Sequence, residues 1–182
     1  AGTSSQPTCA AKALMPIDPQ QLKEASGLAV SQQHPGVFYQ INDEGAFLYA
    51  STPETGANKR IGIESFTPKD SEDLAYGPCG IDKMCIFIGD IGDNDRRRET
   101  ISVAIIVEPK DLPTTLKPER VLTLKYPDGP HNAESMALHP NGDLYIVTKE
   151  RFKKRQPLSA KIYRVKKTDW QNVTTAPLTL EY

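Results

Sequence analysis

Carboxylates stand at the two ends of short apolar segments along this chain, in positions that predict a shared site. Carboxylates that gather without cationic partners repel one another, so they commonly hold a cation or stay in water. A hard ion such as Ca²⁺ takes about six to eight oxygen ligands, which acidic side chains supply. We therefore expect a calcium site, in which the ion is held by Glu72, Asp73, Asp90, Asp93 and Glu134.

The segment Gly89-Asp-Ile-Gly-Asp-Asn94 has a second interpretation that needs no metal. Asp and Asn side chains hydrogen-bond to nearby backbone N–H groups and so stabilise tight turns. In that interpretation Asp90 and Asp93 only cap turns. A third alternative is an acid–base role of the carboxylates without a metal. Zinc suits the chain less well, because no His pair or Cys set is in place.

Three consecutive arginines, Arg96, Arg97 and Arg98, follow this segment directly. An arginine pairs with a phosphate or carboxylate through two parallel hydrogen bonds, so the run predicts an anion-binding site. Beside a metal, such a site would suit a phosphoester. The alternative is a solvated run of charge without a ligand.

His131 lies in the segment Tyr126-Pro-Asp-Gly-Pro-His-Asn-Ala-Glu134. A histidine takes up and releases protons near neutral pH, so it is a candidate general base. We predict catalytic roles for His131 and Glu134. The alternative is that a single histidine in a loop rich in Gly and Pro is structural. The sequence contains no nucleophile elbow, phosphate-binding loop or dinucleotide fingerprint that would favour another chemistry.

Cys79 and Cys85 lie beside the turn-forming residues Pro78 and Gly80. If the flanking segments are adjacent antiparallel strands, the two sulfurs meet across the hairpin as a disulfide. The alternative is two free thiols. Cys9 is left over, either free or paired with a group outside this sequence. The chain begins with small polar residues of the kind that removal of a signal peptide leaves, so we expect a secreted or periplasmic protein.

Three repeats position these residues, and each opens on a short motif. The motifs are Ser26-Gly-Leu-Ala29, Glu72-Asp-Leu-Ala75 and Glu134-Ser-Met-Ala137. A turn rich in Gly, Pro or Asn follows each motif, and then comes a second apolar run. The runs are short, β-branched and aromatic, which is typical of strands. With two further strands in each repeat, the pattern predicts an all-β fold of three four-stranded β-propeller blades. A β-sandwich of regular hairpins is the alternative.

The predicted blades cover residues 26–66, 70–126 and 132–182, and residues 1–25 precede them. We expect a short helix over 18–25, an outer strand for the last blade of a complete ring over 12–17, and a final strand over 177–182. In a four-stranded meander, the start of the first strand lies beside the end of the second. The carboxylates therefore share one face of the disc.

The length of 182 residues is typical of one domain, and 22 basic residues balance 23 acidic ones. This balance excludes a generic basic nucleic-acid binder, and no apolar run is long enough to span a membrane. Propellers have roughly four to eight blades, so three blades do not close a ring. Because open blade faces are apolar, we expect a second polypeptide or a second copy to close it.

Two longer motifs carry a family resemblance: Gly89-Asp-Ile-Gly-Asp-Asn94 with its arginines, and Tyr126-Pro-Asp-Gly-Pro-His-Asn-Ala-Glu134 with Gly142-Asp-Leu-Tyr-Ile-Val-Thr-Lys149. Together with Ser26-Gly-Leu-Ala29 and His34-Pro-Gly36, they resemble bacterial exported six-bladed β-propeller proteins of largely unknown function. That group is loosely similar to calcium-dependent β-propeller phytases, esterase-like phytase domains and lactonase-type propellers. The resemblance implies the six-bladed fold, of which this chain holds half, and export, but no reaction.

Two functions from different classes follow. In the first, the chain belongs to a metal-dependent hydrolase of a phosphoester or lactone, in which the metal activates water or polarises the substrate. In the second, the same face binds a small anionic molecule or a protein without catalysis, and any Ca²⁺ is structural. The fold alone does not choose between them, because propellers host both.

Overall fold

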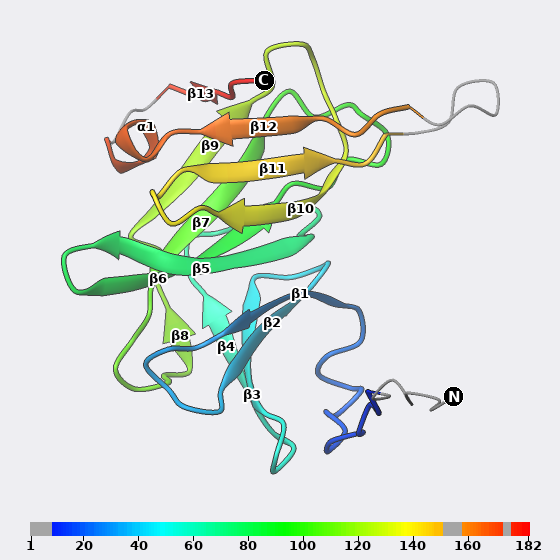
Figure 1. The fold of residues 1–182 in the computed structure, drawn as a ribbon, viewed down its shortest axis with the longest axis vertical. Helices are drawn as coiled ribbons and strands as arrows, with labels where there is room; N and C mark the ends of the chain where they lie inside the picture. Colours follow the sequence, from blue (N-terminus) through cyan, green and yellow to red (C-terminus); the bar gives the residue numbers. More distant parts are fainter. Residues whose placement is uncertain (1–8, 151–157, 173–175) are drawn as a thin grey trace, which may run out of the picture.

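Alternating apolar and polar residues produce three mainly antiparallel sheets, which together make an all-β fold. The structure is a computed structural model that describes residues 9–150, 158–172 and 176–182. The chain builds one sheet after another, from the lower to the upper part of Figure 1.

The first sheet is a meander of four strands, extended by a fifth strand from further along the chain. In spatial order its strands are β1 (Ala25–Val30), β2 (Phe38–Asn42), β3 (Phe47–Thr52), β4 (Ala57–Ile63) and β8 (Thr115–Leu116). The short strand β8 pairs in parallel with β4. The sequence predicted the meander but assigned no strand to Thr115–Leu116.

The middle sheet is built in the same way. Its strands are β5 (Asp73–Gly80), β6 (Lys83–Asp90), β7 (Ile101–Val107), β9 (Arg120–Lys125) and β13 (Leu178–Thr179), the last of which pairs in parallel with β9. The β5–β6 hairpin carries a disulfide between Cys79 and Cys85, whose Cα atoms are 5.7 Å apart. This disulfide confirms the prediction. Cys9 is exposed and free.

The third sheet contains β10 (Ala133–Leu138), β11 (Leu144–Thr148) and β12 (Ile162–Val165), and α1 (Lys167–Gln171) follows it. The final strand predicted over 177–182 is divided between two sheets. Leu178–Thr179 joins the middle sheet, and only Glu181 bridges to Arg164 of β12. Between these two contacts, Leu180 is buried in the core that the middle and third sheets share. Within the described residues, no helix is long and apolar enough to cross a membrane.

Both faces of the middle sheet are buried, because alternate residues of a strand point to opposite faces. Toward the first sheet point Leu74, Ile86, Ile88, Ala104 and Ile106, which join a core with Tyr39, Leu48 and Ile61. Toward the third sheet point Ala75, Phe87, Val103, Ile105 and Leu122, which join a core with Met136, Ile146 and Tyr163. The first strands of the sheets are consequently neighbours, with β5 between β1 and β10 (Figure 1).

Residues 9–24 run along the first sheet and, in this described segment, form neither helix nor strand. Where a helix was expected over 18–25, the chain makes a single turn, in which the Asp18 carboxylate accepts the Gln20 N–H at 2.8 Å. The side chain of Asn42 donates to the Gln21 carbonyl at 3.0 Å and draws the segment toward the sheet. Residues 12–17, where we expected an outer strand, pair with none of the three described sheets. The expected partner of that strand was the last blade of a complete ring, which is not among these sheets.

Candidate functional site

The sheets bring loops from all three repeats to one end of the molecule, where β10 begins and β11 ends (Figure 1). At this end, the start of each first strand lies beside the end of the second, as the pairs Ala25–Asn42, Asp73–Gly89 and Ala133–Thr148 show. We call it the polar end; it comprises residues 43–46, 91–100, 126–132 and 149–150 with the adjoining strand ends. All the predicted ligand, anion-binding and catalytic residues lie here.

Asp90 is buried at the end of β6, and its carboxylate is fully engaged by the chain itself. One oxygen accepts the backbone N–H groups of Lys69 and Asp70 at 2.9 and 2.8 Å. Arg98 donates to both oxygens, at 3.0 and 2.6 Å, and Ser102 donates at 2.9 Å. These five hydrogen bonds compensate the buried charge and leave the carboxylate no free direction for a metal.

Asp93 caps the turn that follows. Its carboxylate accepts the backbone N–H groups of Arg97 and Arg98 at 3.0 and 2.8 Å. Its own N–H donates to Asn132 Oδ1 at 2.7 Å, which joins the turn to the third repeat. The turn places Arg96 in the left-handed region, at φ 54°. The turn-capping interpretation thus describes what Asp93 does in this structure.

Asp73 ties two first strands together. One oxygen accepts the Leu74 N–H at 2.8 Å, and the other accepts the Met136 N–H of β10 at 2.7 Å. Burial raises the pKa of Asp73, and these two backbone hydrogen bonds oppose that increase. The role of Asp73 here is to hold β5 beside β10.

Of the five predicted calcium ligands, Glu72 and Glu134 are the least constrained by contacts with the rest of the chain. Glu134 accepts a hydrogen bond from Lys149 Nζ at 2.6 Å. Burial, followed by the charges of Asp70, Glu134 and Asp43, raises the pKa of Glu72 to about 7. Burial and the charge of Asp43 also raise the pKa of Asp70. The carboxylates that crowd one another here are those of Asp43, Asp70, Glu72 and Glu134, and we call these four residues the acidic group.

The five predicted calcium ligands do not face a common point. Within the described ranges, no three His, Cys, Asp or Glu side chains are arranged to hold a metal ion. Asp90 and Asp93 hold a loop, Asp73 holds two strands together, and Glu134 faces a lysine. Calcium binding by this set stays a prediction, and the acidic group around Glu72 is the part that best fits a cation.

The three arginines point to different partners. Arg98 makes the two-point ion pair with Asp90, and Arg96 Nη2 lies 2.9 Å from Glu150 Oε2. The side chain of Arg97 is 81% exposed. The three arginines do not form the single anion-binding site that was predicted, because Arg96 and Arg98 are already paired with buried carboxylates.

His131 lies between two carboxylates from different loops. Its Nδ1 is 2.9 Å from Glu150, and its Nε2 is 2.9 Å from Asp128. Only the doubly protonated ring donates to both acceptors at once. Partial burial disfavours the charge on Asp128, but hydrogen bonds from Lys161, Tyr163 and His131 outweigh it and hold its pKa far below the usual range. His131 and Glu134, predicted as a catalytic pair, thus face different partners.

Tyr126 lies beneath this histidine and is 4% exposed. Its ring packs edge-on against His131 and Tyr163, with centroids 5.1 and 4.8 Å apart. Its hydroxyl has no hydrogen-bond partner among the described residues, and the same holds for the buried Nε atoms of Arg96 and Arg98. Burial raises the pKa of Tyr126, which the nearby charge of Arg98 opposes. The site therefore contains buried donors without acceptors.

Several residues of this network were not predicted from the sequence. Tyr126 and Asp128 belong to the motif that singled out His131, so the signal for them was present. Glu150 follows the second strand of its repeat, at the same kind of position as Asp90, so its place on this face was expected from the sequence but its role was not. Tyr163 lies inside β12 and resembles any core aromatic residue, so the sequence offered no signal for it.

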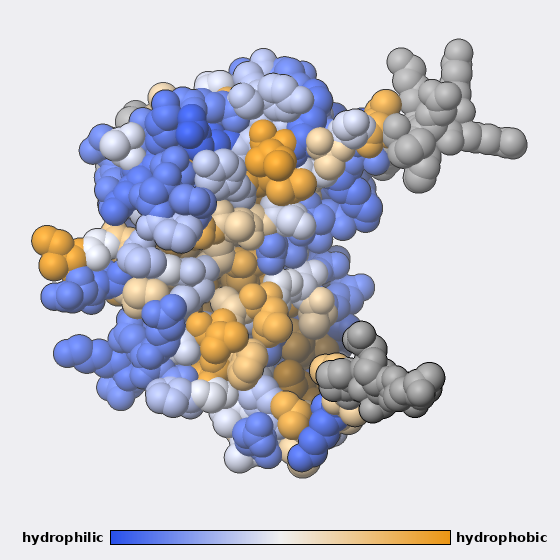
Figure 2. Space-filling view, viewed as in Figure 1, coloured by the Kyte–Doolittle hydropathy of each residue, from blue (hydrophilic) through white to orange (hydrophobic). Residues whose placement is uncertain are grey.

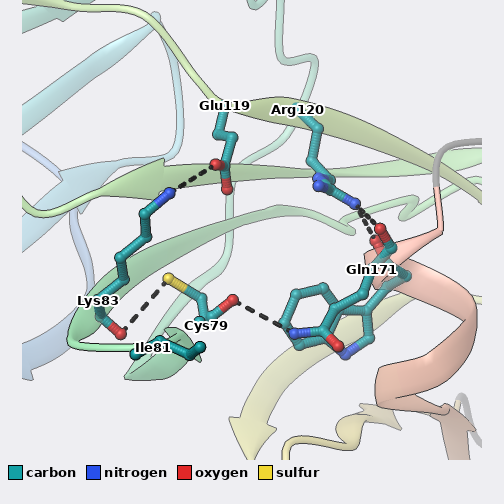
Figure 3. A pocket seen from close by; sticks show the side chains of 8 residues that line it. Cys79, Ile81, Lys83, Glu119, Arg120 and Gln171 are labelled. Atoms are coloured by element: carbon teal, nitrogen blue, oxygen red, sulfur yellow. Dashed lines mark hydrogen bonds and ion pairs between the residues drawn. The ribbon is translucent and has the colours of Figure 1, made fainter.

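A pocket of about 340 Å³ lies near the opposite end of the middle sheet, beside the disulfide (Figure 3). Its lining residues are Cys79, Gly80, Ile81, Lys83, Glu119, Arg120, Trp170 and Gln171. Lys83 and Glu119 form an ion pair at 3.4 Å, and Arg120 donates to the carbonyls of Trp170 and Gln171 at 2.8 and 2.5 Å. The contacts of Arg120 connect the wall of the pocket to α1.

No family model matches this chain, and no curated protein matches it. The function must therefore be inferred from the geometry of the polar end.

Proposed function

We propose that the three sheets are consecutive blades of a β-propeller whose polar end binds a small anionic ligand without catalysis. Two observations support the blade arrangement: the first strands of successive sheets are neighbours, and the middle sheet is buried on both faces. The resemblance of the longer motifs to exported six-bladed propellers agrees with it. In this proposal a second polypeptide or a second copy supplies the remaining blades.

The buried donors carry the proposal of ligand binding. Among the described residues, the Nε atoms of Arg96 and Arg98 and the hydroxyl of Tyr126 lack hydrogen-bond partners. An arginine Nε–H only donates, so the missing partner is an acceptor. A buried donor left unpaired costs about 1–3 kcal/mol, which a ligand with suitably placed oxygen atoms would recover.

The surrounding charges limit what this ligand is. Arg96 already faces Glu150, and Arg98 already faces Asp90, so neither guanidinium is a free cation. Asp93 lies in the same loop and adds a further negative charge near the donors. The repulsion is larger for a dianion such as phosphate than for a carboxylate, which brings two acceptor oxygens with only one charge. We therefore favour a small carboxylate.

The test titrates the chain with acetate and follows the arginine Nε–H signals by NMR. Saturable shifts are expected at Arg96 and Arg98, with none at the exposed Arg97, which serves as the internal control. Tyr126→Phe removes one donor and is expected to weaken acetate binding roughly fivefold to tenfold. Equal shifts at all three arginines, or shifts that do not saturate, would contradict the proposal.

A second candidate is a metal-dependent hydrolase of a phosphoester or lactone, and the acidic group favours it. The raised pKa of Glu72, caused by burial and neighbouring carboxylates, marks a place where a cation would relieve repulsion. Glu72 and Asp70 would hold Ca²⁺, with Glu134 beside them, and the bound ion would polarise the substrate. Calorimetry with Ca²⁺ tests this candidate: binding is expected in the wild type and not in Glu72→Gln. No heat of binding in either protein would remove it.

We also propose that the protein is exported, since the Cys79–Cys85 disulfide is compatible with an oxidising compartment. Alkylation of free thiols in the protein isolated from cells, followed by its intact mass, tests this point. One modified cysteine, Cys9, is expected. Three modified cysteines would show that the disulfide does not form where the protein resides.

A further inference from the structure

A chain of charged contacts connects His131 to the donors that we propose bind a ligand. His131 Nδ1 lies 2.9 Å from one oxygen of Glu150, and Arg96 Nη2 lies 2.9 Å from the other. Arg96 Nη2 and Nε nevertheless have no hydrogen-bond partner among the described residues. The hydrogen bond of Glu150 is therefore with His131, and Arg96 keeps two donors on one edge, which is the arrangement that pairs with the two oxygens of a carboxylate.

The ring of His131 has hydrogen-bond partners in both of its protonation states. When it is protonated, both nitrogens donate, one to Asp128 and one to Glu150, each at 2.9 Å. The hydroxyl of Tyr163 lies 3.1 Å from Nε2, so it can donate to that nitrogen in the neutral ring while Nδ1 still donates to Glu150. The ring therefore keeps its place in both states, and only its charge changes.

The other charges around His131 are already matched. Three ion pairs surround it, and they are Arg96–Glu150, Arg98–Asp90 and Lys161–Asp128. Tyr126 and Tyr163 also face the ring, and both keep their protons because burial raises the pKa of each. Asp93 adds a further negative charge nearby. An anion that enters this site meets no surplus of positive charge unless His131 is protonated.

We propose that the polar end binds a carboxylate together with a proton, which is taken up by His131. The proton supplies the positive charge that offsets the charge of the ligand. Binding is reciprocal, so the bound carboxylate raises the affinity of the ring for its proton by the same factor. In Figure 2, hydrophilic side chains predominate at the right-hand edge of the molecule, where β10 begins and β11 ends, so this end borders the water that provides the proton. The inference rests on the proposed ligand binding and adds the regulation of that site.

The first measurement repeats the acetate titration at pH 6 and pH 8, an interval that includes the ordinary titration range of a histidine, near pH 6.5. Wild-type protein is expected to bind acetate about fivefold to tenfold more tightly at pH 6 than at pH 8. His131→Gln keeps a side chain that forms hydrogen bonds but carries no charge, so it should lose most of this ratio. His139→Gln is the matched control and should keep the ratio, because His139 is exposed in the β10–β11 turn at the other end of these strands.

The second measurement follows the histidine ring signals of the wild type by NMR over this pH range, with and without saturating acetate. The signal that is missing in His131→Gln identifies His131. It is expected to change at a pH higher by roughly 0.7–1 unit in acetate, which is the logarithm of the same fold-change. His34 and His139, which lie in turns at the opposite end of the sheets, should change at the same pH in both samples.

The outcomes separate this inference from ligand binding itself. Burial raises the pKa of Glu72 to about 7, so Glu72 also gains charge in this interval, but its contribution would survive in His131→Gln. Equal affinity of the wild type at both pH values, or a ratio that His131→Gln retains, would overturn the inference alone. Absence of saturable shifts at Arg96 and Arg98 at both pH values would overturn ligand binding and the inference with it. If circular dichroism shows that His131→Gln is not folded, the ring titration of the wild type decides.

Discussion

The boundary between the first and middle sheets and the boundary between the middle and third sheets treat buried polar groups differently. In the first boundary, the buried carboxylate of Glu108 accepts hydrogen bonds from the hydroxyls of Ser31, Tyr39 and Tyr76. In the second boundary, Tyr126 is similarly buried, but no described residue accepts its proton. Tyr39 and Tyr76 of the first boundary have an acceptor for the hydroxyl proton, and so does Tyr163 of the second, which donates to Asp128, but Tyr126 has none among the described residues.

The difference teaches that burial of a polar group does not by itself identify a site. Around Glu108, neutral donors surround one charge, and bonds of this kind are roughly twice as strong as those between neutral groups. Burial and the bond to Glu108 raise the pKa of Tyr76 to about 12, so its hydroxyl keeps its proton. The three hydroxyls around Glu108 are therefore satisfied within the described chain, whereas Tyr126 in the second boundary retains capacity for an added acceptor.

The largest effect is expected from Asp90→Ala at the polar end. The substitution leaves Arg98 without its carboxylate and two backbone N–H groups without their acceptor. Breaking a buried ion pair costs about 3–5 kcal/mol of unfolding free energy, which urea denaturation measures. Asp95→Ala, at an exposed position in the same loop, is the control and should change stability by less than about 0.5 kcal/mol. Equal losses would show that Asp90 is not the residue holding this loop.

The next largest effect is expected from Glu108→Gln in the first boundary. The amide keeps the shape of the side chain but removes the charge and one acceptor, so at least one of three buried hydroxyls loses its bond. A loss of about 2–3 kcal/mol is expected in urea denaturation. Glu119→Gln, which affects only a partly exposed ion pair with Lys83, should cost less than about 1 kcal/mol. A loss at Glu108 no larger than this control would remove the contrast between the boundaries.

A smaller effect concerns the pH dependence of stability caused by Glu72. Its pKa of about 7 in the folded protein lies above the ordinary value of 4.5, so the folded state binds more protons between these values. The unfolding free energy therefore falls as the pH rises from 4.5 to 7. The contribution is about 1–2 kcal/mol after allowance for solvent screening. Denaturation at pH 5 and pH 8 should show a smaller difference in Glu72→Gln; an unchanged difference would exclude Glu72 as its source.

The smallest effect is expected from Tyr126→Phe in the protein without ligand. Removing a buried hydroxyl that has no partner among the described residues sacrifices no hydrogen bond and removes the desolvation cost of an unpaired donor, so the unfolding free energy should not fall and should rise by about 1 kcal/mol. Tyr39→Phe is the matched substitution in the first boundary, where the hydroxyl donates to Glu108 at 2.8 Å. It should cost about 1.5–3 kcal/mol. If the two substitutions cost the same, the two boundaries do not differ.

Much of the fold could be predicted, because its signals are local. The opening motifs, such as Glu72-Asp-Leu-Ala75, placed the first strands, and the spacing of Cys79 and Cys85 indicated the hairpin disulfide. The two-residue strand Thr115–Leu116 was not predicted, and Leu178–Thr179 lies in the predicted strand over 177–182 but pairs with the middle sheet instead of the third. Segments this short carry no alternation, and their partner strands belong to other repeats.

The sequence predicted where the carboxylates of the candidate site lie, but not which contacts they make. The carboxylates were correctly expected at one end of the sheets, because strand direction determines that. Whether Asp90 is free for a ligand depends on the Lys69 and Asp70 N–H groups, which reach it from a separate loop. No pattern in the sequence reports such a contact. For the same reason the acceptor role of Glu108 was not predicted.

The parallel pairing of β8 with β4 also affects how the chain is made. The strand that completes the first sheet comes from the middle repeat, and β13, which completes the middle sheet, comes after the third. Synthesis adds roughly 5–20 residues per second, so the outer edge of β4 remains unpaired for several seconds after it leaves the ribosome. An unpaired edge can join other strands. We therefore expect the nascent chain to be most prone to aggregation, and to need a chaperone most, before β8 emerges.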